Sequence, residues 1–324
     1  MTSTGSIVYD MHPCYKIYNV SYILISTPSV VCVLFYVFLG SLSVVTVFGN
    51  LLVIISIIYF KQLHTPTNSL ILSLAVADLL VGVLVFPSSM AFPFSLCLFR
   101  ENVFCKVRDS IYITLCTCSI LNLCCISIDR YYAVCQPLTY RIKINHSAVV
   151  VMILISWTVS VITGNSFTFA ELEQGTYACK EKCFIDVLLA TTMGIILSFY
   201  LPLIIMLCIY LKIFLVAQRH ARSIHNTTCQ STKSGATVSK MERKATKTLA
   251  IVMGVFLICW TPCFVCTTFT SVASVIEALN WLTLSNSMLN PLIYAFFYSW
   301  FRSAFRMIIS GKIFKGDSAN TKLF

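Results

Sequence analysis

Seven long windows almost free of charged residues dominate the sequence. Each window is long enough to cross a bilayer as an α-helix, which takes about 20 residues. Only 11% of the chain is charged, whereas a soluble domain carries about 25%. Alternating strands of about ten residues are absent, so a helical bundle is predicted rather than a barrel. The windows are 32–59, 67–92, 104–128, 148–168, 187–211, 248–270 and 276–299.

The basic residues predict how this bundle is oriented. Of the 23 Lys and Arg residues, 17 fall on one side of the predicted membrane. Since basic residues concentrate in cytoplasmic loops, that side is expected to be the cytoplasm. Seven spans then place the N-terminus outside and the C-terminus inside a plasma membrane. The basic residues lie in separate segments, so the net charge of +11 does not indicate a nucleic-acid partner.

The sequence divides into three parts. Residues 1–31 form an expected extracellular N-terminus, and residues 32–299 form the seven-helix domain. In residues 300–324, apolar Phe301 and Phe305 alternate with Arg302, which is the pattern of an amphipathic helix. The predicted fold is therefore an all-α membrane protein, a seven-transmembrane helix bundle with a short amphipathic eighth helix on the membrane lipid.

The cysteines fit this orientation. Cys97 lies near the predicted outer face, so five cysteines, an odd number, are expected on that side. Four cysteines fall on that side, where disulfides persist, and they allow three pairings. Asn19 begins an Asn-Val-Ser glycosylation sequon on the same side. The four are Cys14, Cys105, Cys179 and Cys183. Nine more are expected to be small buried apolar residues in the spans: Cys32, Cys116, Cys118, Cys124, Cys125, Cys208, Cys259, Cys263 and Cys266.

Short motifs follow one another through all seven windows. Asn50 lies in the first, Asp78 in the second, and Asp129-Arg130-Tyr131 closes the third. Trp157, Pro202 with Tyr210, Trp260-Thr-Pro262, and Asn290-Pro291-Leu-Ile-Tyr294 mark the other four. This ordered set resembles the rhodopsin-like class of G-protein-coupled receptors.

The seventh window narrows the resemblance. Residues 286–301, from Asn286 to Phe301, are similar to the fingerprint of trace amine-associated receptors. That resemblance implies a chemosensory, olfactory receptor for small extracellular ligands, which raises cyclic AMP through a stimulatory heterotrimeric G protein. It also implies two disulfides, Cys105 with Cys183 and Cys14 with Cys179, and no cofactor.

Asp78 is an ionisable residue within a membrane span, which by itself suggests a function. Polar residues of other spans are candidates to converge on it. The resemblance implies a pocket for sodium and water there, and the alternative is an interhelical hydrogen-bond cluster. The candidates are Ser119, Asn286, Ser287 and Asn290.

The inner ends of the spans carry the expected switch. Glu242 is expected to pair with Arg130 and hold the bundle closed, and outward movement of the sixth span would release the arginine. The resemblance assigns inward movements to Tyr210 and Tyr294. Together with Asp129 and Tyr131, these are the residues expected to act in activation and G-protein coupling.

The predicted ligand site departs from the family pattern. Aminergic receptors bind an ammonium through an aspartate in the third span, and both counts, from Cys105 and from Arg130, place Tyr112 there. The supporting tyrosine of the seventh span is replaced by Leu284. A substitute aspartate of the fifth span is replaced by Gly194.

Two ligand hypotheses follow. In the first, Asp109, one turn from Tyr112, anchors an amine, although neighbouring Arg108 is able to neutralise it. In the second, the ligand is a small molecule that is not an amine. The expected lining is Asp109, Tyr112, Ile113, Cys116, Gly194, Trp260, Cys263, Phe264, Asn280, Trp281 and Leu284.

Other classes of protein fit less well. A transporter would be expected to show internal repeats, and none is found. Residues 276–299 contain no lysine, so retinal cannot form a Schiff base there. No glycine loop that binds phosphate and no histidine with metal-ligand spacing is present, so an enzyme is not expected.

Overall fold

The computed structural model describes residues 9–12, 15–18, 21–24, 30–91, 103–176, 193–194, 196–227, 251–252, 254–266 and 273–311. The long helices are α1 (Val30–Tyr59), α2 (Pro66–Leu80), α5 (Val103–Cys135), α7 (His146–Thr176), α9 (Leu201–Thr227) and α11 (Ala273–Phe297). A further helical segment, Gly254–Cys266, lies between α9 and α11 in the sequence. Short helices are α3 (Phe86–Ala91), α6 (Pro137–Lys143) and α12 (Ser299–Ile309).

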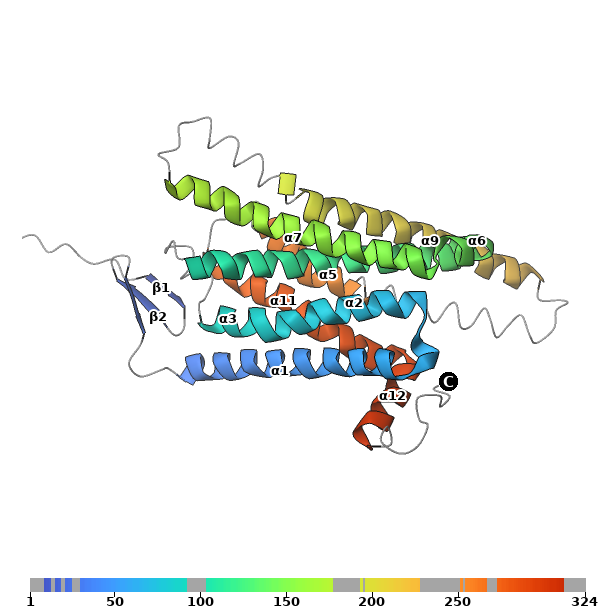
Figure 1. Cartoon of the computed structure of the whole chain (residues 1–324), viewed down its shortest axis with the longest axis horizontal. Helices are drawn as coiled ribbons and strands as arrows, with labels where there is room; N and C mark the ends of the chain where they lie inside the picture. Colours follow the sequence, from blue (N-terminus) through green and yellow to red (C-terminus); the bar gives the residue numbers. More distant parts are fainter. Residues whose placement is uncertain are drawn as a thin grey trace, which may run out of the picture.

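The helices form an elongated bundle (Figure 1), as the seven windows predicted. Among the described residues, five helices are long and apolar enough to cross a membrane, namely Val30–Tyr59, Pro66–Ala91, Val103–Cys135, His146–Ser166 and Ile196–Val216. Gly254–Cys266 is a shorter apolar helix, and α11 is the seventh helix of the bundle. Large apolar side chains such as Phe48 and Leu154 are exposed on the flanks, which suits a surface that contacts lipid.

Helix α5 lies at the centre of the bundle, where it packs against α2, α7 and α9. Helix α1 packs against α2 and α11. Because α5 runs the length of the bundle, its two charged pairs mark opposite ends. The pairs are Arg108 with Asp109 and Asp129 with Arg130. These are called here the Asp109 end and the Arg130 end.

Glycine permits the close approach of α1 to α11. A Cβ atom added at Gly49 would lie 2.9 Å from Cβ of Pro291 and 3.0 Å from its Cγ. Carbon atoms normally approach no closer than about 3.5 Å. The pairing of these two helices therefore depends on the absence of a side chain at residue 49.

Prolines interrupt or follow irregular turns in the long helices, because each proline removes a backbone donor. Pro202 follows a π-helical turn at Ile196–Tyr200, and Pro291 lies inside α11. A second π-helical turn, Val81–Val85, separates α2 from α3 and is likewise followed by a proline, Pro87. In contrast, Pro66 begins α2, where the hydroxyl of Thr65 caps the helix by accepting from the backbone N–H of Asn68 over 3.2 Å.

Helix α12 at the Arg130 end confirms the expected eighth helix. Trp300, Phe301 and Ala304 are buried, and the helix contacts α1 and α11. Arg302 donates 2.8 Å to the carbonyl oxygen of Phe296, which joins α12 to the end of α11. Its apolar face therefore packs partly on the bundle, with Ile309 exposed.

A small antiparallel sheet of β1 (Tyr9–His12), β2 (Tyr15–Tyr18) and β3 (Ser21–Leu24) adds to the helical bundle. Strands β2 and β3 pair from Tyr15 with Leu24 to Tyr18 with Ser21. These strands were not predicted from the sequence because four residues are too few for a clear alternating pattern. Cys14 and Asn19 lie outside the described residues.

Two expectations about the cysteines in the spans were wrong. Cys32, near the beginning of α1, is disulfide-bonded and only 5% exposed. Cys208 is exposed rather than buried. The other seven predicted span cysteines are free and buried or half-buried. A bonded Cys32 adds a sixth cysteine to the five expected on the predicted outer side, so the number expected there is no longer odd.

Candidate functional site

The polar residues expected around Asp78 do converge on it. Its carboxylate accepts hydrogen bonds from Ser119 (3.1 Å), Ser287 (2.7 Å) and Asn290 (2.8 Å). The four residues come from α2, α5 and α11, and all are buried. The carboxylate therefore joins three helices inside the bundle, at a depth where a lone charge would be costly.

Asn286 is also buried, but its Nδ2 atom makes no hydrogen bond to a described residue. The predicted core is thus complete except for this amide, which does not reach Asp78. The carboxylate and the two serine hydroxyls are oxygen ligands of the kind that hard cations prefer. These residues fit a sodium ion, and as they stand they also form a satisfied hydrogen-bond cluster.

Asn50 forms the link from α1 to this core. Its Nδ2 atom donates to the backbone carbonyls of Thr46 (2.9 Å) and Ser287 (3.0 Å). Because Ser287 itself bonds to Asp78, α1 is connected to the carboxylate through one residue. The sequence showed Asn50 as a motif residue without revealing this contact.

At the Arg130 end, Asp129 is fully buried and holds its neighbour. Arg130 Nε donates to Asp129 over 2.8 Å, and Nη2 bonds both to Asp129 and to Thr67. Two hydroxyls also donate hydrogen bonds to the Asp129 carboxylate, that of Thr67 over 3.0 Å and that of Tyr140 over 2.9 Å. Arg130 is thereby held inside its own bundle.

Sequence reasoning missed Thr67 and Tyr140. Thr67 lies at the start of α2 and Tyr140 on α6, and no motif marked either. Burial raises the pKa of Tyr140 above its usual value, so its hydroxyl stays protonated as a donor at neutral pH. Glu242, the residue expected to pair with Arg130, lies outside the described residues.

The other activation residues occupy separate positions. Tyr294 is buried, and its ring packs edge-on against Tyr298. The ring of Tyr131 faces Lys212 of α9, with 5.9 Å from Nζ to the ring centroid. Tyr131 is therefore oriented toward α9 and takes no part in the Asp129 cluster.

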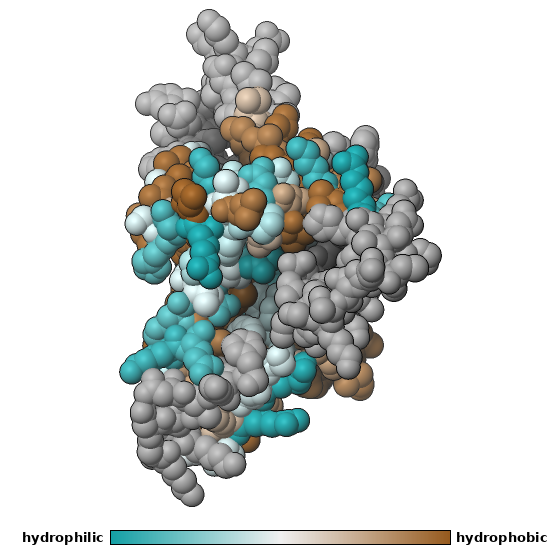
Figure 2. Space-filling model, turned by 90° about the vertical axis from the view of Figure 1, so that its right-hand side faces the viewer, coloured by the Kyte–Doolittle hydropathy of each residue, from teal (hydrophilic) through white to brown (hydrophobic). Residues whose placement is uncertain are grey.

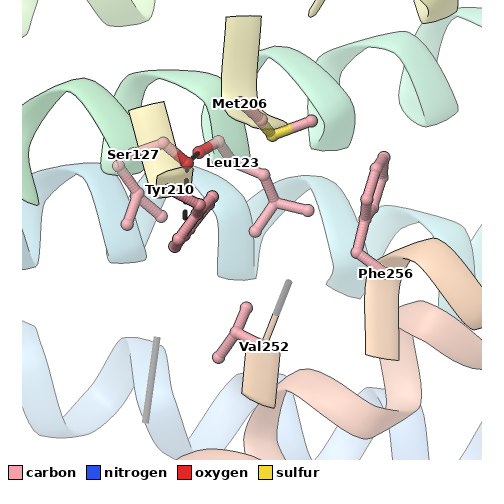
Figure 3. Close-up of a pocket in the computed structure, with 7 residues that line it drawn as sticks. Leu123, Ser127, Met206, Tyr210, Val252 and Phe256 are labelled. Atoms are coloured by element: carbon pink, nitrogen blue, oxygen red, sulfur yellow. Dashed lines mark hydrogen bonds between the residues drawn. The ribbon is translucent and has the colours of Figure 1, made fainter. Parts of the chain in front are cut away.

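Tyr210 and Ser127 border a small cavity between α5, α9 and the Gly254–Cys266 segment (Figure 3). Their hydroxyl oxygens are hydrogen-bonded at 3.3 Å. The volume is about 10 Å³, roughly the space for one water molecule. The remaining lining is apolar: Leu123, Ile126, Met206, Val252 and Phe256. The packing between these three helices is thus imperfect near the Arg130 end.

In the half of the bundle nearer Asp109, Tyr112 meets two polar residues of α11. Its hydroxyl lies 3.3 Å from Oδ1 of Asn280 and 3.3 Å from Oγ1 of Thr283. The thiol of Cys263 also donates to Oδ1 of Asn280 at 3.3 Å. Three predicted ligand-site residues therefore come together, and Thr283, which was not predicted, joins them.

Asp109 is paired with its neighbour. Arg108 Nε donates to Oδ1 of Asp109 over 2.8 Å, and the side chain of Arg108 is 4% exposed while that of Asp109 is 31% exposed. The geometry therefore matches the neutralised salt bridge that the sequence left open.

Aromatic rings occupy the adjacent space. Phe199 and Phe264 stack with 3.6 Å between centroids and 8° between planes. Trp260 packs beside them, and its buried Nε1 atom makes no hydrogen bond to a described residue. An N–H donor buried without a partner is costly, so this position favours a group that accepts a hydrogen bond.

The remaining predicted ligand residues are distributed around this cluster. Trp281 contacts Phe35 and Phe86 edge-on or tilted, and Leu284 is buried against Leu115. Cys116 is buried in the main core, and Ile113 is half-buried. Gly194 accepts from the Ser198 hydroxyl through its carbonyl oxygen. Leu284 and Trp281 thus belong to the wall toward α1 and α3.

Comparison with known proteins agrees with this arrangement. Residues 49–294 match the 7 transmembrane receptor (rhodopsin family). Trace amine-associated receptor 1 of Macaca mulatta is 45% identical over 96% of this chain and 98% of its own length. Trace amine-associated receptor 4 of Mus musculus is 43% identical, covering 91% and 90%. Trace amine-associated receptor 9 of Mus musculus is 41% identical, covering 100% and 98%.

These matches extend over nearly the whole chain and over nearly the whole of each relative. They identify the chain as a receptor and exclude the transporter and enzyme classes that the sequence was weighed against. The chain is a multi-pass membrane protein, and it belongs to the trace amine-associated receptors of the rhodopsin family.

Proposed function

We propose that this receptor detects small extracellular molecules in olfaction and raises cyclic AMP through a stimulatory heterotrimeric G protein at the plasma membrane. The names of its relatives place it among trace amine-associated receptors. The observation that carries the proposal is the closed arrangement of Arg130, which Asp129 and Thr67 hold inside the bundle. A half-buried, paired arginine at a helix end is a group that a conformational change can release.

The distribution of charge supports the proposed orientation. Hydrophilic residues are spread across the Arg130 end in Figure 2, among apolar patches. Basic residues of this end include Lys61, Arg141, Lys143, Lys212 and Arg302. The positive-inside rule then favours a cytoplasmic Arg130 end and an extracellular Asp109 end. The disulfide at Cys105 is compatible with an oxidising exterior, where Cys183 is its proposed partner and Asn19 is glycosylated.

The proposed motion separates Gly254–Cys266 from α5 and α9 near the cavity. Movement at that loosely packed place costs fewer contacts than movement in a filled core. Tyr210 and Tyr294 then approach the released Arg130, and Glu242 no longer restrains it. A sodium ion at Asp78 would supply a positive charge that favours the closed arrangement.

A cyclic-AMP reporter in cells tests the proposal. Cells that express the receptor at the surface should respond to members of a mixed panel of amines, alcohols, amides and esters. The Arg130→Ala variant should lose the response at equal surface expression. A response carried only by inhibitory or calcium-linked G proteins would contradict the stimulatory coupling.

An amine sensor anchored by Asp109 is the second candidate. Its support is the 31% exposure of that side chain, since an exposed carboxylate can attract a cation. The Asp109→Asn variant tests it because the amide keeps the shape and removes the charge. Unchanged responses to amines would exclude this anchor.

A further inference from the structure

We propose that the ligand is an uncharged molecule with a hydroxyl or primary amide group, held at Tyr112, Asn280 and Thr283. This inference rests on the proposed receptor function and names the class of ligand. It differs from the amine that an aspartate at residue 112 would bind. The cluster joins α5 to α11. Tyr112 is separated in the sequence from Asn280 by 168 residues and from Thr283 by 171.

The hydrogen atoms of the cluster can be assigned from its contacts. Thr283 donates its one hydroxyl proton to the carbonyl oxygen of Asn280 over 2.7 Å. Its oxygen is then an acceptor for Tyr112. Asn280 Oδ1 also accepts, from Tyr112 and from Cys263. The single proton of Tyr112 is thus shared between two acceptors.

Two bonding positions follow from this assignment. The phenol oxygen of Tyr112 has lone pairs that accept, and the Nδ2 group of Asn280 has two protons that donate. Asn280 Nδ2 makes no bond to Tyr112, Thr283 or Cys263 in this arrangement. The Cys116 thiol also bonds to the Tyr112 hydroxyl, which leaves one lone pair of the phenol oxygen for a ligand. A ligand hydroxyl or primary amide, which both donates and accepts, fits the two positions together.

The existing bonds are weak enough to give way. O–H···O bonds in proteins are usually about 2.5–3.0 Å long, and both bonds of Tyr112 measure 3.3 Å. A ligand group placed between Tyr112 and Asn280 can form shorter bonds than those it displaces. The cluster therefore gains from a polar ligand.

An ammonium is disfavoured at the same place. Removing a charge from water costs several kcal/mol, and every polar group in the cluster is neutral. Asp109 is already bonded to Arg108. Cation–π contact with the aromatic rings recovers only a small part of that cost. The neutral ligand thus avoids a cost that this site does not offset.

The rest of the ligand is expected to be apolar with an acceptor of hydrogen bonds. Trp260, Cys263 and Phe264 follow one face of a helix, since they are spaced by three and four residues. Cys263 contacts the cluster through Asn280, and Phe264 stacks on Phe199. The buried Nε1 of Trp260, which makes no hydrogen bond to a described residue, favours an oxygen atom at the deeper end of the ligand.

Matched pairs of probes test the charge preference directly. The melting temperature of the receptor, purified in lipid nanodiscs, is measured in the presence of each probe. The pairs are 2-phenylethanol with 2-phenylethylamine, and 3-methylbutanol with 3-methylbutylamine. Each pair differs in one hydroxyl or ammonium group. Ligands that bind the folded state raise its melting temperature, so this readout does not require G-protein coupling.

The alcohols are expected to stabilise the wild-type receptor at concentrations at least tenfold below the amines. Tyr112→Phe should weaken the alcohols about tenfold, while Tyr132→Phe, the same change near the other end of α5, should not. Tyr112→Asp should reverse the order within each pair. An amine that exceeds its alcohol on the wild-type receptor overturns the inference.

The two proposals can fail separately. Stabilisation by alcohols without a cyclic-AMP response would contradict the coupling and support the ligand class. A cyclic-AMP response to amines alone would support the coupling and contradict the ligand class. If no probe stabilises the wild type and Tyr112→Asp gains no amine binding, Tyr112 does not determine the ligand charge and the inference is wrong.

Discussion

The hydroxyl of Tyr140 donates a 2.9 Å hydrogen bond to Asp129, eleven residues away in the sequence and on a different helix. Asp129 is the residue that holds Arg130. The short helix α6 is therefore connected to the third spanning helix at its charged pair. Any change that alters α6 acts on the group that restrains Arg130.

Tyr140→Phe is expected to raise signalling without ligand. A hydrogen bond to a charged group contributes about 1.5–3 kcal/mol, so its loss should favour the open arrangement about tenfold or more. Basal cyclic AMP at matched surface expression measures this. Tyr132→Phe is the control because the Tyr132 hydroxyl makes no hydrogen bond to a described residue. Equal basal activity of the two variants would contradict the role of Tyr140.

Gly49→Ala should destabilise the receptor by about 1–3 kcal/mol, as overpacking does. The new Cβ atom would meet the stiff ring of Pro291 at 2.9 Å. Gly40→Ala on the same helix has no atom within 4 Å of the new Cβ, and it should be neutral or slightly stabilising through helix propensity. Melting of both variants in nanodiscs checks this, and an equal melting temperature would count against tight α1–α11 packing.

Cys32→Ser should lower the melting temperature because it removes a disulfide. Bonds of this kind stabilise by about 2–4 kcal/mol. Cys208→Ser is the matched control, since Cys208 is a free and exposed thiol. Peptide mapping after alkylation without reductant would identify the partner of Cys32. Alkylation of Cys32 itself under those conditions would contradict the bond.

Asp78→Asn should abolish any stabilisation by sodium. The amide keeps the shape of the carboxylate but loses the charge that attracts a cation. Melting in NaCl is compared with melting in choline chloride at equal ionic strength. The wild type should be more stable in NaCl and the variant equally stable in both. A sodium effect that persists in the variant would place the ion elsewhere.

The sequence predicted the helices well because their cause is local. Long apolar windows must form helices in a bilayer to satisfy the backbone. The observed boundaries of α1 and of the Pro66–Ala91 span lie within two residues of the predicted ones. The predicted fifth and sixth windows extend into residues outside the described part of the chain. The short strands β1 to β3 were not predicted because they lack such a local signal.

The convergence of Ser119, Ser287 and Asn290 on Asp78 was also predictable, since polar side chains in membrane spans form hydrogen bonds with one another between helices. The sequence could not show that Asn286 stays apart, because that depends on the rotation of α11. Thr67 and Tyr140 were missed for the same reason. Their contacts with Asp129 exist only once α2, α5 and α6 are packed together.

The sequence alone determined the membrane bundle, the family and the absence of an aspartate at residue 112. These follow from composition, window length and the order of motifs along one chain. Only the tertiary structure decided what Tyr112 does, since its partners Asn280 and Thr283 come from α11. The sequence left open whether Arg108 pairs with its neighbour Asp109, and the folded structure decided that it does. Hydrogen bonds between distant residues depend on helix rotation and depth, which no single segment encodes.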